Sequence, residues 1–247
     1  LDYVLEKIIN KKLFFSCSIP EEHEEMLKRT NLSFDQYEKL YKYFSYSGKD
    51  NIKEFIRLFF NIAEGRAYDI AELKKSKQYG IYYKNKIVEN EEAYIKNLLK
   101  LNKKLVGILI NVSYVKTGNT KHIDRLIEVL ESKNLGVLTI FARIGPDRDK
   151  GIYGAMKDYF YYEGSLIIDS IIALNGYSIS TFYNGKDRDF DLSLFESFNL
   201  PVFQGITIFL SREDFIKDPQ GLDFAALSVN VYQPEMDGQI ITIPIAT

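Results

Sequence analysis

The segment Pro234-Glu235-Met236-Asp237-Gly238 holds two carboxylates two residues apart, between a proline and a glycine. Carboxylates accept protons and bind hard cations, so this spacing suits cation binding or general acid/base work. We therefore take Glu235 and Asp237 as candidate catalytic residues. The alternative is a plain turn before the last strand, because Asp-Gly is a common turn pair.

A second polar cluster, Gly118-Asn119-Thr120, lies where an apolar run gives way to an amphipathic segment. Asn119 or Thr120 can accept hydrogen bonds from the free backbone amides of the following helix, and the same helix end could hold a ligand carboxylate or phosphate. His122 comes just inside this helix, where an imidazole facing a ligand could carry a proton or bind a metal. A helix cap and a solvent-exposed histidine are the alternatives.

Both clusters belong to a series of alternating strands and helices. Residues 105–141 have the pattern of strand, glycine-containing loop, amphipathic helix and strand, which is one complete parallel crossover unit. Ligands of open α/β sheets bind at the carboxyl ends of strands, so Gly118-Asn119-Thr120 marks a candidate site. The apolar pattern predicts strands at 105–111, 135–141, 166–174, 201–208 and about 239–245, and helices at 121–133, 153–162, about 192–198 and twice between 211 and 230.

The first part of the chain has a different pattern. Residues 1–75 are predicted to be helical, with apolar side chains at helical spacing, and a short strand at 78–83 and a helix at 91–101 follow. The sequence thus predicts a small helical region, 1–75, before an α/β domain, 76–247, with a doubly wound, mostly parallel sheet of the Rossmann or flavodoxin-like kind. The polar stretch 184–191 is predicted to be an exposed loop.

Composition limits the classes of partner. The 32 basic and 34 acidic residues give a net charge of −2, which offers no electrostatic reason to expect nucleic acid or an anionic membrane. One cysteine, Cys17, excludes an intrachain disulfide and favours the cytoplasm. The sequence lacks a membrane-spanning apolar run and a GxGxxG or GxxxxGK[ST] nucleotide motif. The chain starts at Leu1 and ends in an apolar run, so we expect a longer protein that extends beyond both ends.

Five segments form an ordered series of motifs. They are KLYKYFSYSGKDNIKEFIRLFFNIAEG (39–65), VGILINVSYVKTGNTKHIDRLIEVLESKNLGVLTIFA (106–142), SIIALNGYSIS (170–180), LPVFQGI (200–206) and GLDFAALSVNVYQPEMDGQIITIPI (221–245). In this order they resemble segments of cobaltochelatase large subunits and magnesium-chelatase H subunits. The matching elements include the Gly-Asn-Thr loop, Leu-Pro-Val-Phe-Gln at the place of the family's Val-Pro-Val-x-Gln, and Pro-Glu-x-Asp-Gly.

The resemblance implies a fragment of the tetrapyrrole-binding large subunit of an ATP-dependent metal chelatase, inactive alone. Such an enzyme inserts Co²⁺ or Mg²⁺, its substrate, into a corrin precursor or a porphyrin, and AAA+ ATPase partner subunits use the ATP. The resemblance further implies that Glu235 and Asp237 accept protons or handle the metal. Gly118, Asn119 and Thr120 would then shape the tetrapyrrole cleft, with His122 beside them, and no resident metal site is implied.

Two positions depart from the family pattern. Val112 stands where the family has an arginine before the Gly-Asn-Thr loop, and Tyr83 stands where the Gly-Ile-Tyr-His element has its histidine. Both changes remove a group suited to macrocycle carboxylates, metal or protons. They favour an alternative, a non-catalytic module of the same fold that binds a tetrapyrrole or another small ligand. A flavodoxin-like scaffold with an unrelated ligand is the third hypothesis.

Overall fold

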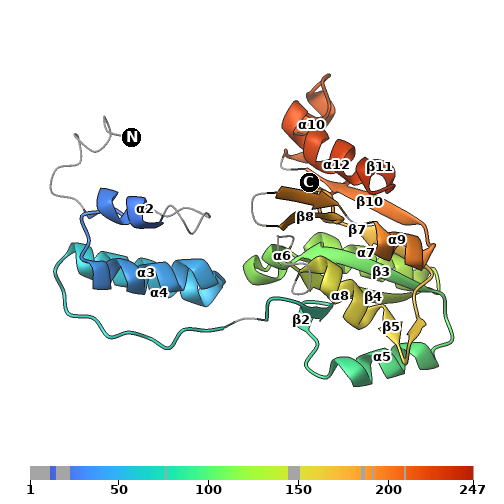
Figure 1. Ribbon diagram of the computed structural model, residues 1–247, viewed down its shortest axis with the longest axis horizontal. Helices are drawn as coiled ribbons and strands as arrows, with labels where there is room; N and C mark the ends of the chain where they lie inside the picture. Colours follow the sequence, from blue (N-terminus) through green and yellow to red (C-terminus); the bar gives the residue numbers. More distant parts are fainter. Residues whose placement is uncertain are drawn as a thin grey trace. The chain divides into compact units, whose positions relative to one another are not determined.

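The computed structural model describes residues 12–14, 23–75, 77–143, 151–184, 187–190, 192–208 and 210–246. The chain divides into two compact units between residues 76 and 77. Figure 1 shows the helices of the first unit in blue and the sheet and helices of the second in green to red. Among the described residues, no helix has the length and apolar character needed to cross a membrane.

The first unit consists of α2 (His23–Arg29), α3 (Phe34–Tyr46) and α4 (Lys49–Ala63). Ser33 begins α3 with a capping box, in which Ser33 Oγ accepts from the Gln36 amide and the Gln36 side chain accepts from the Ser33 amide. The Asn51 carboxamide accepts from the Lys74 amide at 3.1 Å and donates to the Lys74 carbonyl at 2.8 Å. This pair ties the extended segment after α4 to the helix.

The second unit is built on a seven-stranded sheet in the order β11-β10-β7-β3-β4-β1-β2. Neighbouring strands are parallel along the series β11, β10, β7, β3 and β4. In contrast, β1 is antiparallel to both of its neighbours, β4 and β2. Their bounds are β1 (Gly80–Tyr83), β2 (Lys86–Ile87), β3 (Leu105–Asn111), β4 (Gly136–Ala142), β7 (Ser170–Ala173), β10 (Val202–Thr207) and β11 (Ile240–Ala246).

Helices cover both faces of this sheet. On β3, Leu105 and Leu109 point into a core with α5 (Glu91–Lys100), α8 (Ile152–Tyr159) and α9 (Ser193–Phe198). The alternate residues Ile108 and Ile110 point into a second core with α7 (Lys121–Ser132). Buried apolar side chains on both faces explain why the strands are continuous apolar runs. The predicted doubly wound, mostly parallel α/β class is confirmed.

A short helix not predicted from the sequence, α6 (Val112–Thr117), follows β3 directly. Asn111 ends the strand and caps this helix, because its side-chain oxygen accepts from the Ser113 amide at 2.9 Å. Gly118 ends the helix in the left-handed conformation, with φ of 72°, which glycine adopts without steric cost. The connection from β3 to α7 is therefore a helical turn and a tight cap.

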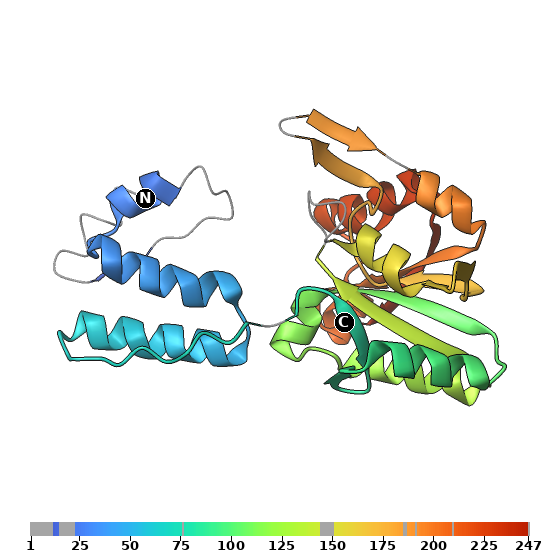
Figure 2. The same ribbon diagram turned by 60° about the horizontal axis from the view of Figure 1, so that its bottom comes forward.

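Two other predictions were wrong in detail. The expected strand at 166–174 is divided into β6 (Ser165–Leu166), which pairs with β5 (Tyr161–Tyr162), and the sheet strand β7. The expected loop at 184–191 instead contains the strand β9 (Asp187–Phe190) and the last residue of β8 (Thr181–Asn184), and these two strands pair as an antiparallel hairpin. Figure 2 shows this hairpin in orange, extending from the main sheet. The polar sequence of 184–191 lacks the alternation of a half-buried strand, so the pattern predicts a loop there.

The C-terminal part carries α10 (Arg212–Lys217) and then one continuous helical run of α11 (Phe224–Leu227), η2 (Ser228–Tyr232) and α12 (Gln233–Met236). Asp223 caps the run by accepting from the Ala226 amide at 2.7 Å. Its middle turn, η2, is a π-helix, a widening often found at functional sites. Pro234, which lacks an amide hydrogen, lies just beyond that turn. The Pro-Glu-x-Asp-Gly motif is thus the end of a helix.

Candidate ligand-binding site

The order of the strands creates a switch point at the carboxyl end of the sheet. The strand β3 lies between β4 and β7, so the chain leaves β3 toward one side for β4 and returns on the other side for β7. Ligands of open α/β sheets bind in the crevice outside the strand ends at such a point. Asn111 is the last residue of β3, and Leu174 and Asn175 follow β7 directly.

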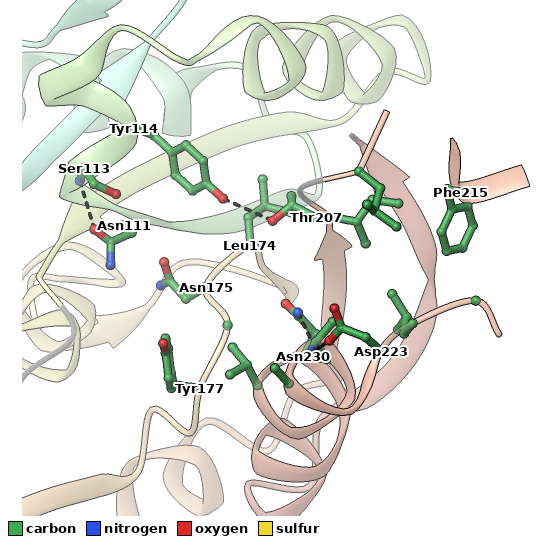
Figure 3. Close-up of a pocket in the computed structure, with 18 residues that line it drawn as sticks. Asn111, Ser113, Tyr114, Leu174, Asn175, Tyr177, Thr207, Phe215, Asp223 and Asn230 are labelled. Atoms are coloured by element: carbon green, nitrogen blue, oxygen red, sulfur yellow. Dashed lines mark hydrogen bonds between the residues drawn. The ribbon is translucent and has the colours of Figure 1, made fainter. Parts of the chain in front are cut away.

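A cavity of about 460 Å³ opens at this edge. Its walls come from the start of α6, the loop after β7, the end of β10 and the helical run that begins at Asp223, as Figure 3 shows. The volume lies within the range of small-molecule sites, roughly 300–1,000 Å³. The lining residues are Asn111, Ser113, Tyr114, Leu174, Asn175, Gly176, Tyr177, Thr207, Ile208, Leu210, Phe215, Gly221, Leu222, Asp223, Ala225, Ala226, Val229 and Asn230.

The described lining is mostly apolar, with amides and hydroxyls at a few places. Asp223 is the only described lining residue that carries a formal charge at neutral pH, and its carboxylate caps α11. Asn230, on the π-helical turn, donates to the Ala226 carbonyl at 3.0 Å. Apolar walls with a few fixed polar groups are typical of ligand pockets, in which the polar groups orient the ligand.

Asn175 is the most deeply buried polar side chain of this wall, with 1% of its surface exposed. Its backbone carbonyl accepts from Gln204 Nε2 at 3.1 Å, and Gln204 is itself completely buried on β10. Its carboxamide oxygen and nitrogen have no hydrogen-bond partner in the described part of the chain. Burying such groups without partners is costly, so an unpaired amide in the wall of a cavity is an unusual feature.

The loop that carries Asn175 is held against the π-helical turn. Tyr177 has a φ of 73°, and its amide donates to the Val229 carbonyl at 2.7 Å. A Cβ on Gly176 would lie 2.6 Å from Val229 Cγ1, closer than real contacts allow. Any other residue at this position would force Val229 or the loop to shift, so glycine suits this close approach.

Tyr114 links the cavity to the predicted cluster on the other side of α6. Its hydroxyl pairs with Thr207 Oγ1 at 3.1 Å, which joins α6 to the end of β10. The His122 ring packs edge-on against the Tyr114 ring, with centroids 5.0 Å apart. Burial lowers the pKa of His122, whose Nε2 has no hydrogen-bond partner among the described residues. His122 therefore supports the cavity wall as a neutral ring.

The other residues of that cluster form the connection between α6 and α7. Gly118 and Asn119 are exposed, and the Asn119 amide donates to the Tyr114 carbonyl at 3.0 Å. Thr120 is buried and makes no side-chain cap on α7. Burial of Tyr82 raises the pKa of its phenol to about 12, and a hydrogen bond with Thr120 acts against this shift. Gly118, Asn119, Thr120 and His122 do not line the cavity, so their binding role stays a prediction.

The two predicted catalytic carboxylates differ in their surroundings. Asp237 is buried and accepts from Ser178 Oγ and the Ile179 amide, both at 2.6 Å. It also accepts from the hydroxyl of Ser180 and, at 3.1 Å, from Gln239 Nε2. Glu235 is exposed on α12. Neither lines the cavity, and the catalytic role of both stays a prediction.

The residues that sequence reasoning missed are those of the cavity itself. Asn175 precedes Gly176, and this pair directly follows an apolar run, which was a detectable signal at a strand end. The two departures from the family pattern do not line the cavity. Val112, the first residue of α6, packs in the core that contains Ile108 and Ile110, and the Tyr83 hydroxyl donates to Glu131 at 2.8 Å. Among the described residues, no group of three or more His, Cys, Asp or Glu side chains could hold a metal ion.

Comparisons with known proteins bear on this site. Residues 41–247 match the model of the family described as CobN/Magnesium Chelatase. An uncharacterized protein of Methanocaldococcus jannaschii is 27% identical over 236 residues, which is 92% of this chain and 19% of that protein. The aerobic cobaltochelatase subunit CobN of a Sinorhizobium species is 30% identical over 136 residues, or 55% of this chain and 10% of that subunit.

A solved structure has the same fold. The catalytic subunit of cobaltochelatase from Mycobacterium tuberculosis superposes with a TM-score of 0.61 over 98% of this chain, at 14% sequence identity. The chain spans 19% of that subunit. Both the sequence and the structural comparison thus match a portion of much longer proteins.

Proposed function

The chain belongs to the CobN/magnesium chelatase family, and from this premise we propose that it is part of the large, tetrapyrrole-binding subunit of an ATP-dependent metal chelatase. The reaction is the insertion of Co²⁺ or Mg²⁺ into a corrin precursor or a porphyrin. The observation that supports this best is the cavity at the switch point, which lies within the matched residues. Its mostly apolar walls suit one edge of a flat, apolar macrocycle.

The chemistry of insertion requires that two pyrrole protons leave and that the metal ion loses its water. We propose Glu235 as the proton acceptor, because its carboxylate is exposed on α12 and makes no described hydrogen bond. Asp237 accepts four hydrogen bonds and would position the loop after β7. Gly118, Asn119, Thr120 and His122 would shape the cavity through α6 and Tyr114.

The remaining parts of the reaction belong to other chains. We propose that AAA+ ATPase partner subunits hydrolyse the ATP, since the sequence lacks a phosphate-binding loop. The chain spans a fifth or less of its relatives, so we expect it to bind the macrocycle but not to insert metal alone. A cytoplasmic location agrees with its single cysteine.

Titration of the chain with protoporphyrin and with metal-free corrinoids, followed by the Soret-region spectrum, tests the proposal. We expect saturable binding of one of these classes. The proposal fails if the chain and the full-length subunit both leave every tetrapyrrole unbound.

The role of Glu235 is tested separately in the complete chelatase with its partner subunits. Replacing Glu235→Gln is expected to lower metal insertion at least tenfold while the macrocycle still binds, because the amide cannot accept a proton. An equal loss of binding and insertion would show that Glu235 only shapes the end of α12.

The alternative, a module that binds a tetrapyrrole without inserting metal, is favoured by Val112 and Tyr83. It predicts binding without insertion even in the unaltered complete protein.

A further inference from the structure

The cavity presents one complete and unused hydrogen-bonding group. The Asn175 carboxamide is buried, lines the cavity, and has neither its donor nor its acceptor engaged in the described part of the chain. Figure 3 shows this carboxamide between the side chains of Asn111 and Tyr177. A site built to hydrogen-bond a ligand leaves these groups free for it, since most buried polar atoms in proteins are otherwise paired.

The backbone of Asn175 is held at its own carbonyl and at the two residues that follow it. Gln204, buried on the neighbouring strand β10, holds the Asn175 backbone carbonyl. The following residues, Gly176 and Tyr177, are held against Val229. A side chain on a backbone held in this way offers its donor and acceptor in a fixed geometry, which is what selective recognition requires.

The charge of the cavity limits the ligand group that Asn175 can bind. The described lining contains no Lys, Arg or His, and Asp223 adds a negative charge. An ionised carboxylate could accept from the NH2 group of Asn175 but would also face its carbonyl oxygen, without a cation in the described lining to compensate. A neutral group with a donor beside an acceptor, such as a carboxamide or a lactam, matches both atoms of the Asn175 carboxamide.

We propose that Asn175 is the specificity-determining residue of this cavity, and that it selects a neutral donor–acceptor edge of the ligand over an ionised carboxylate. This inference rests on the proposed function for the identity of the ligand as a tetrapyrrole. Gln204 acts as a positioning residue, because it contacts Asn175 and is absent from the cavity lining.

The test uses two porphyrins that differ only in the group concerned, protoporphyrin IX and its diamide, in which both propionates are primary carboxamides. Affinities are measured at pH 7.5 by Soret-band titration. We expect the chain to bind the diamide about tenfold more tightly, which is the value of one well-placed pair of hydrogen bonds to a buried group. In Asn175→Leu the ratio of the two affinities is expected to fall about tenfold.

Two further variants make the test decisive. Asn175→Ser is smaller and serves if Asn175→Leu does not fold, because its hydroxyl can donate to a carboxylate and the ratio should again fall. Asn61→Leu, on α4 in the other unit, is the matched control and should keep the ratio of the unaltered chain. Folding of each variant is checked by circular dichroism.

The outcomes distinguish a failure of the tetrapyrrole function from a failure of the role of Asn175. If neither porphyrin binds to the unaltered chain or to the full-length subunit, the tetrapyrrole function and the role of Asn175 both fail. If both porphyrins bind but the diamide is not preferred, or the preference persists in Asn175→Leu and Asn175→Ser, the role of Asn175 is wrong and the proposed function stands.

Discussion

Asp237 joins two segments that lie far apart in the sequence. Its carboxylate accepts from Ser178, Ile179 and Ser180, which follow β7, and from Gln239, which precedes β11. Hydrogen bonds to a charged acceptor are among the strong ones in proteins, and here they hold the loop that begins with the cavity wall. Asp237, a candidate catalytic residue by its sequence, therefore has a structural role in holding the loop after β7.

Replacing Asp237→Asn should destabilise the chain by about 3 kcal/mol, because the amide removes a charged acceptor and turns a donor toward other donors. The free energy of unfolding in urea measures this. Glu235→Gln, two residues away and exposed, is the control and should change the value by less than about 0.5 kcal/mol. A loss below about 1 kcal/mol in Asp237→Asn would show that the described network does not hold the loop.

At the scale of elements, the regular parts of the sheet could be predicted because their signals are local. The strand β3 has the bounds expected from its apolar run, and α7 ends one residue earlier than expected. The helix α6 was missed because Val112, Val115 and Thr117 are β-branched and favour strands. Its formation depends on the Asn111 cap and on burial of Val112, which are tertiary effects.

The candidate site was harder to predict than the fold. The Gly118 cluster was expected at a strand end and does follow β3, but α6 lies between the two, and the cluster does not line the cavity. The cavity is made by β3, β7 and β10 lying side by side, an order that no local pattern encodes. The contacts that hold Asn175 and its loop in place come from Gln204 and Val229, which are distant in the sequence.

The contact between the loop after β7 and the π-helical turn makes a prediction about these elements. Gly176→Ala would place a Cβ 2.6 Å from Val229 Cγ1, so the Val229 side chain or the loop must shift. We expect a loss of about 2 kcal/mol in the free energy of unfolding. Val229→Ala removes the colliding methyl group, so the double variant should be more stable than the sum of the two single changes predicts. Additive losses would show that the loop and the helix are not in this contact.

At the scale of the whole molecule, each apolar core belongs to one unit. The core of the helical unit contains no described residue beyond Leu73, and the two cores of the α/β unit contain none before Tyr79. The ion pair between Lys77 and Glu91, at 3.1 Å, likewise lies within the second unit. A unit with its own cores has the means to fold alone.

A chain of residues 77–247 is therefore expected to fold independently and to keep the cavity, because every cavity residue lies in it. Its free energy of unfolding in urea should agree within about 1 kcal/mol with that of the same unit in the full chain, followed by far-ultraviolet circular dichroism. Its affinity for the porphyrin that the full chain binds should agree within twofold. A fragment that fails to fold, or that binds more than tenfold more weakly, would show that the helical unit contributes to the stability or to the site of the α/β unit.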